Sequence, residues 1–218
     1  MAVKKSAFQR YIDIPLFYKL GSALIIGAIV GLIVGPPMAK IGWLGTLFIN
    51  LLKMVVMPVV FFSLVVGVSR IPLKKLGKVG VETVIVYMLT SVIAIFIGLA
   101  IGNWINPGVG MEIGKAEITV PSPPSPSQQV LNIIPTNPLA SMATGKVLPT
   151  IFYAIIFAIA LIKLRDSKEE TFKKAGDIIF SFCEGGAQIM YKIVRGVLEY
   201  GVIGVFALLA TVFGLHGI

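Results

Sequence analysis

The sequence is poor in the residues that build most catalytic and metal sites. Its 218 residues include one cysteine, Cys183, and one histidine, His216. A single cysteine excludes an internal disulfide framework and a metal site made of paired cysteines. We expect His216, which has no carboxylate or cysteine near it in the sequence, to be an interfacial polar residue. Hydrolase, zinc-protease and phosphate-loop motifs are missing too, so the sequence does not indicate an enzyme.

Charge is also scarce. Charged residues make up 13% of the chain and hydrophobic residues 56%, with a mean hydropathy of +0.93. Soluble domains contain about 25% charged and about 45–50% apolar residues, so this balance points to lipid as the solvent. The net charge of +9 comes from short basic clusters between apolar runs, not from a basic stripe. Such clusters are typical of membrane anchors, and we expect no nucleic-acid partner.

Five segments are long and apolar enough to cross a bilayer as helices. They cover residues 16–34, 43–68, 81–104, 147–164 and 189–215. The segment that follows the basic N-terminus ends in Val-Gly-Pro-Pro without a small-residue cleavage site, which favours a retained helix over a secretory signal. The predicted fold class is therefore all-α, a multi-pass membrane protein.

The distribution of lysine and arginine predicts the orientation of these spans. Basic residues gather in the N-terminal arm, between the second and third spans, and after the fourth span, whereas the other two links have few. The positive-inside rule then places the N-terminus in the cytoplasm and the C-terminal end of this chain outside.

Proline dominates the long link between the third and fourth spans. Residues 120–129, VPSPPSPSQQ, are predicted to be an extended external tether that cannot form a helix, because proline lacks an amide donor and has a fixed φ. Pro135, Pro138 and Pro149, with Gly145, then divide an apolar region into short pieces. Broken helices survive at membrane depth only inside a larger packed assembly.

Lys53 lies about ten residues into the second span, with Pro58 shortly after it. A lysine at the centre of a span costs about 2.5–3.5 kcal/mol on insertion scales unless it reaches water. Two interpretations follow equally well from the residues: Lys53 borders an internal polar surface, or it extends to the interface from a tilted helix.

Polar side chains in two other spans suggest local interactions. Tyr87, Thr90 and Ser91 share one sector of the third span, and their oxygens can contribute to a site for a small hard cation such as sodium if other helices add ligands. The alternative, hydrogen bonds to their own helix or a neighbour, is commoner in membrane proteins. In the fifth span, Glu199 follows Arg195 by four residues, a spacing that predicts a structural ion pair.

Several blocks together resemble the dicarboxylate/amino acid:cation symporters, the family of glutamate and aspartate transporters. GTLFINLLKMVVMP, residues 45–58, is similar to the first signature of that family, with Thr46 in place of an acidic residue. The resemblance continues in order through SLVVGVSRIPLKKLGKVGV, VYMLTS, IIPTNPLASMATGKVLPTIFYAII and MYKIVRGVLEYGVIGVFALLA. Gly201 and Val202 stand where archaeal relatives have a proline after the tyrosine, so any bending or ion-leak role of that proline does not carry over.

The resemblance implies a trimer in which a transport domain slides along a static scaffold. This chain looks like helices one to five of eight, without the hairpins and the Asn-Met-Asp-Gly-Thr motif that supply the substrate site. Tyr87, Thr90 and Ser91 match one part of a sodium site, and Lys53 matches a scaffold lysine that faces the transport domain. The implied units are scaffold helices 1–2 (residues 1–78), transport helix 3 (79–105), an external link (106–130), broken scaffold helix 4 (131–165), and a cytoplasmic link with scaffold helix 5 (166–218).

Three hypotheses about function follow. The first is the N-terminal portion of a sodium- or proton-coupled symporter for acidic amino acids or C4-dicarboxylates in a plasma (inner) membrane, with the substrate site outside this chain. The second is a non-transporting scaffold that trimerises. The third is an anion leak along the exposed scaffold face near Lys53.

Overall fold

The computed structural model describes residues 14–105 and 125–217. This part of the chain is helical and contains no strand. The elements are α2 (Leu16–Val34), the 3₁₀ helix η1 (Pro36–Ile41), α3 (Gly42–Ser69), α4 (Leu73–Ile105), α5 (Pro126–Ile133), α6 (Pro138–Ala143), α7 (Val147–Arg165) and α8 (Glu170–His216). The all-α prediction is confirmed.

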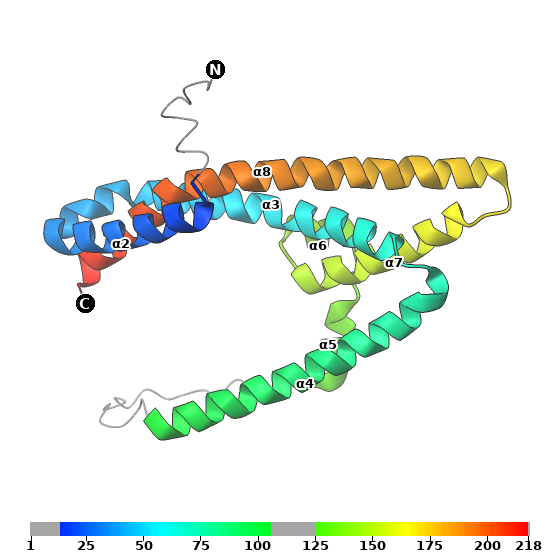
Figure 1. The fold of residues 1–218 in the computed structure, drawn as a ribbon, viewed down its shortest axis with the longest axis horizontal. Helices are drawn as coiled ribbons and strands as arrows, with labels where there is room; N and C mark the ends of the chain where they lie inside the picture. Colours follow the sequence, from blue (N-terminus) through cyan, green and yellow to red (C-terminus); the bar gives the residue numbers. More distant parts are fainter. Residues whose placement is uncertain (1–13, 106–124, 218) are drawn as a thin grey trace, which may run out of the picture.

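Helix α8 is the axis of the molecule. It has 47 residues, and Figure 1 shows it running along the length of the bundle in yellow to red. Its C-terminal half packs against α2, η1 and the first half of α3, and its N-terminal half against α7 and the end of α3. The two ends of α8 therefore belong to two different helix clusters.

Each cluster has its own small core. One is centred on Val65, Ala154 and Cys183, with aromatic side chains around it. The other contains Phe48, Val55 and Val197. Small residues allow the helices to approach closely here: a Cβ atom added at Gly204 of α8 would lie 2.3 Å from the Cβ of Phe48. The helix continues through Gly201 and Val202 without interruption.

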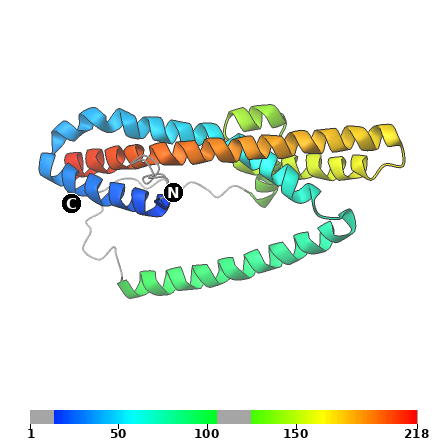
Figure 2. The same ribbon diagram turned by 45° about the horizontal axis from the view of Figure 1, so that its top comes forward.

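Helix α4 lies apart from this bundle, and Figures 1 and 2 show the separation from two directions. None of its residues is buried, although its sequence is strongly apolar. In water such a surface would be unfavourable by about 25 cal/mol per Å². The exposed apolar surface of α4 therefore requires lipid or another protein surface around it.

Five helical segments have the length and composition to cross a membrane. They coincide with the five predicted spans, but α4 begins at Leu73 and α8 at Glu170, both within the predicted basic links. The charged residues there did not end the helices, because an exposed helix face accommodates charge outside the hydrocarbon. Much of the segment predicted as a link after the fourth span is thus helix.

The prediction that residues 120–129 are extended is wrong at their C-terminal end. Residues 120–124 lie outside the described part of the chain, but helix α5 begins at Pro126, inside the segment predicted to be extended. Pro126 occupies the first helical turn, where a missing amide costs nothing, and the Ser125 hydroxyl accepts a hydrogen bond from the Gln128 amide at 3.3 Å. A proline at this position starts a helix and does not prevent it.

The broken segments after α5 follow the prolines. Helix α6 has six residues, with Pro138 in its first turn and the Asn137 side chain accepting from the Ala140 amide at 3.0 Å. Gly145, at φ +73°, then turns the chain into α7. The left-handed conformation explains the glycine at this position.

Candidate functional site

Lys53 borders an open cleft of about 830 Å³ between the middle of α3 and the α6–α7 turn. Its side chain is exposed. Met57, Pro58 and Met142 are among the residues that form the walls. Within the part of the chain that the structure describes, no acidic side chain lines this cleft or pairs with Lys53. The lysine is thus an accessible cation on the surface of a largely apolar cleft.

Pro58 adds a polar group to the same cleft. Helix α3 continues through this residue, but proline has no N–H to donate to the carbonyl four residues earlier. That carbonyl belongs to Met54, which also lines the cleft. A cation and an unused backbone acceptor therefore lie on adjacent residues, an arrangement suited to a hydrated surface and not to a dry helix contact.

The predicted sodium-site residues share a face of α4 but lack a covering helix. Thr90 Oγ1 is 3.0 Å from the carbonyl oxygens of both Val86 and Tyr87, and its hydroxyl donates to this pair. Tyr87 is 72% exposed, and Ser91 is half-buried. The hydroxyl lone pairs remain available, but a cation here would meet ligands from one helix only in the described chain. Thr90 therefore makes the hydrogen bonds to its own helix that were the alternative prediction for this residue.

The most deeply buried charge lies elsewhere. Lys19 of α2 has a side chain only 3% exposed, and its Nζ donates to Glu199 of α8 at 3.1 Å (Oε1) and 3.0 Å (Oε2). The predicted Arg195–Glu199 pair is wrong: Arg195 is exposed and forms no ion pair among the described residues. The Glu199 carboxylate forms its ion pair with Lys19 across the α2–α8 interface, because the buried lysine needs a charged partner. Arg195 is exposed to solvent and does not.

The remaining titratable candidates do not form a metal or catalytic centre. In residues 14–105 and 125–217, no group of three or more histidine, cysteine or acidic side chains is placed to hold a metal ion. Cys183 is buried in the core and His216 is exposed at the end of α8. Sequence reasoning missed the role of Lys19, although a lone lysine inside a first apolar span is a signal for a buried partner.

Five long apolar helices, one of them preceded by short helices broken at prolines, define the class: a multi-pass membrane protein. The comparison with family models makes the class specific. Residues 16–218 match the model described as the sodium:dicarboxylate symporter family, and the chain belongs to that family.

Curated relatives carry consistent names. The chain is 32% identical to the proton/sodium-glutamate symport protein of Bacillus caldotenax, over 94% of this chain and 50% of that protein. It is 29% identical to the proton/glutamate-aspartate symporter of Escherichia coli, over 96% of this chain and 51% of that protein. A C4-dicarboxylate transport protein of Solibacter usitatus is also 29% identical, with coverages of 93% and 48%. The chain spans about half the length of these relatives.

Proposed function

We propose that this chain forms the N-terminal portion of a secondary symporter that moves acidic amino acids or C4-dicarboxylates together with sodium ions or protons. The observation that carries the proposal is the family match over residues 16–218, together with the names of the relatives. These names cover both substrate classes and both coupling ions. The substrate-binding residues lie outside the half of the transporter that this chain represents.

The packing of the helices supports a division of labour within this half. Helices α2, α3 and α7 each pack against α8, and we assign these four helices to the static scaffold. Helix α4 contributes no buried residue and belongs to the moving part. Lys53 then borders the interface along which the two parts slide, where a hydrated cation beside Pro58 is tolerated.

Tyr87, Thr90 and Ser91 are assigned to one wall of a sodium site. Hydroxyl and carbonyl oxygens are suitable ligands for a hard cation, and the Thr90 hydroxyl is already ordered by two backbone carbonyls of α4. The other ligands come from segments outside this chain. A proton replaces sodium as the coupling ion in the alternative form of the proposal.

The proposed assembly is a homotrimer in a plasma (inner) membrane, with the N-terminus in the cytoplasm and the C-terminal end of this chain outside. Basic residues support this orientation, because they gather around the α3–α4 and α7–α8 connections, at one end of the bundle. Cysteines introduced singly at Lys168 and Gly217, in a Cys183→Ala background, test the orientation. Impermeant maleimide should label position 217 from outside and position 168 only after permeabilisation.

Uptake measurements test the functional proposal directly. Vesicles that contain only this chain should show no sodium- or proton-driven accumulation of radiolabelled aspartate, glutamate or succinate. Coupled accumulation by this chain alone would overturn the assignment of the substrate site to the other half. Co-reconstitution with the second half of a relative should restore uptake, and Thr90→Ala should lower its apparent sodium affinity more than Thr83→Ala, a matched change at another hydroxyl that bonds the same helix.

A second candidate is a non-transporting scaffold that trimerises by itself. It is favoured by the fact that four of the five long helices form one connected bundle. Crosslinking in mild detergent should then give a trimer without any additional polypeptide. A monomer at every protein concentration would exclude this candidate.

A further inference from the structure

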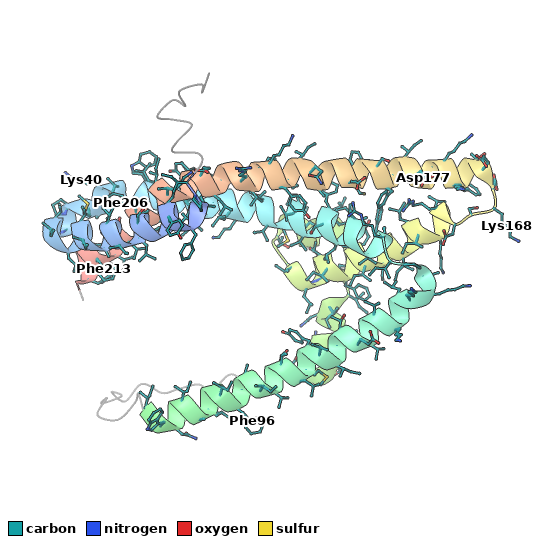
Figure 3. The ribbon with its side chains drawn as sticks, in the orientation of Figure 1. Lys40, Phe96, Lys168, Asp177, Phe206 and Phe213 are labelled. Atoms are coloured by element: carbon teal, nitrogen blue, oxygen red, sulfur yellow. The ribbon has the colours of Figure 1, made fainter. Side chains whose placement is uncertain are left out.

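A second polar site lies at the opposite end of α3 from the 3₁₀ helix. Four chain segments meet there: the end of α3, the start of α4, the end of α7 and the first turns of α8. They line an open pocket of about 620 Å³. Figure 3 labels Asp177, which lines this pocket, and Lys168 at the same end of the molecule.

The lining of this basic pocket carries more positive than negative charge. Its four cationic side chains, one from each segment, are Arg70, Lys74, Arg165 and Lys173. Two acidic side chains, Asp166 and Asp177, also line it. Two connections far apart in the sequence, α3–α4 and α7–α8, therefore bring their positive charges to one small volume.

Two of the four cations have a carboxylate partner and two have none within the described chain. Arg165 Nε donates to Asp177 Oδ1 at 2.9 Å, which leaves the two terminal nitrogens of its guanidinium without a hydrogen-bond partner there. Its guanidinium carbon lies 4.1 Å from the centre of the Phe180 ring, so the side chain is held in place. Lys74 and Lys173 form no ion pair with any described residue.

Arg70 is positioned in a similar way from the other side of the pocket. Its Nη2 donates to Glu184, a residue that does not line the pocket, and its other nitrogens have no acceptor in the described residues. A guanidinium fixed through one nitrogen keeps the remaining donors available for an oxyanion, which it binds in a forked geometry.

An orphaned hydroxyl in the wall points independently to a ligand. Ser69 is 7% exposed, and its Oγ is the buried side-chain polar atom without a hydrogen-bond partner among the described residues. Buried hydroxyls are normally satisfied. Ser69 lines the basic pocket, as do Leu73 and Lys74, whose amides are the first of α4 and have no intrahelical acceptor. Hydroxyl, amide, guanidinium and ammonium donors around one volume suit the oxygens of a phosphate group.

An apolar groove adjoins the basic pocket and indicates what carries the phosphate. The groove has a volume of about 730 Å³ and runs between α4 and α7. Its walls include Val68, Ile71, Leu76, Val84, Ile155 and Ile159, and Ile71 also lines the basic pocket. A free phosphate ion would use only the basic pocket, whereas an amphiphile fills both volumes.

We propose that this end of the bundle binds an anionic membrane phospholipid, with its phosphate in the basic pocket and an acyl chain in the α4–α7 groove. Basic pockets between membrane helices on the cytoplasmic side are suited to such headgroups. Asp166 opposes an anion, but its carboxylate can accept from a hydroxyl of the headgroup, and a glycerol headgroup supplies one. The preferred lipid is therefore a phosphatidylglycerol-type lipid and not phosphatidylcholine.

The chain offers matched controls for a binding experiment. Lys74 and Lys173 line the pocket, whereas their neighbours Lys75 and Lys174 do not. The Lys74→Gln/Lys173→Gln and Lys75→Gln/Lys174→Gln double variants remove the same charge from the same two helices. All four lysines are exposed, so both variants should fold, and circular dichroism checks this.

Native mass spectrometry of the delipidated chain measures the affinity for the first bound dioleoylphosphatidylglycerol. Removing Lys74 and Lys173 should weaken it about 25-fold, since each lysine contributes about fivefold. The control pair should change it less than about threefold. Ser69→Ala should weaken it about fivefold through the lost hydrogen bond to a charged group. Phosphatidylcholine should bind more weakly than phosphatidylglycerol to the unmodified chain.

Three results would overturn the proposal. Equal losses in both lysine pairs would mean general surface attraction. Unchanged affinity in the Lys74→Gln/Lys173→Gln variant would remove the pocket from the site. Inorganic phosphate that binds with the same dependence on Lys74 and Lys173, with no lipid bound, would assign the pocket to the free ion. An Ile159→Trp variant, which fills the groove, should weaken lipid binding and leave any phosphate binding unchanged.

Discussion

The Lys19–Glu199 pair should contribute measurably to the stability of the α2–α8 interface. The two nitrogen–oxygen distances are 3.1 Å and 3.0 Å, and the side chains are 3% and 33% exposed. At an effective dielectric constant of about 20, the attraction between unit charges at this separation is about 5 kcal/mol. Desolvation of the lysine offsets part of it, so the net value is smaller.

We expect Glu199→Gln or Lys19→Met alone to lower the free energy of unfolding by about 3 kcal/mol, because either change leaves the opposite charge at the interface without this partner. The Lys19→Met/Glu199→Gln double variant should recover about 2 kcal/mol relative to the sum of the single changes. Reversible denaturation in mixed micelles, followed by circular dichroism, measures all four corners of the cycle.

The exposed Lys78–Glu82 pair is a suitable comparison. Its atoms are 3.8 Å apart, and its side chains are 80% and 61% exposed. The same cycle there should give a coupling energy of about 0.3–0.5 kcal/mol. If the buried cycle shows no more coupling than this exposed pair, the reasoning about charge burial between α2 and α8 is refuted.

Two further predictions concern packing. Gly204→Ala should lower the free energy of unfolding by about 1–3 kcal/mol, since the new methyl group would lie 2.3 Å from the Cβ of Phe48. Gly98→Ala, where an added Cβ would have nothing within 4 Å, should be neutral or stabilising by up to about 1 kcal/mol. Equal shifts in melting temperature for the two variants would contradict the close approach of Gly204 to Phe48. Cys183 is 2% exposed, so maleimide should label it only on unfolding, whereas Phe182→Cys in a Cys183→Ala background, at a position 70% exposed, should react in the native state. Comparable rates at both positions would place the thiol outside the core.

The sequence was sufficient to predict the all-α architecture and the five spans because each span is a long apolar run, and lipid leaves helix as the available structure. Helix ends were less predictable. Helix α8 begins at Glu170, among charged residues. Outside the hydrocarbon a helix can carry charged side chains, so the end of an apolar run does not mark the end of the helix. Pro126 was misjudged for a related reason, because its effect depends on its position within the helix.

The site residues show where pattern analysis stops. The sequence predicts Lys53 at span depth, where both interpretations require a route to water; in the structure its side chain is exposed beside an open cleft. Glu199 was paired with Arg195 because four-residue spacing is visible in a sequence, whereas the approach of Lys19 from α2 depends on tertiary packing. The basic pocket could not be predicted for the same reason, because its four cations come from two connections that are far apart in the sequence and meet only in the fold.

The length of α8 has a mechanical consequence. At 1.5 Å per residue, 47 helical residues reach about 70 Å, more than twice the roughly 30 Å of hydrocarbon. A large part of α8 therefore stands outside the hydrocarbon unless the helix is steeply tilted. Because its C-terminal half packs against α2 and its N-terminal half against α7, this one rigid rod holds the two helix clusters at a fixed separation. It is the strut of the proposed scaffold.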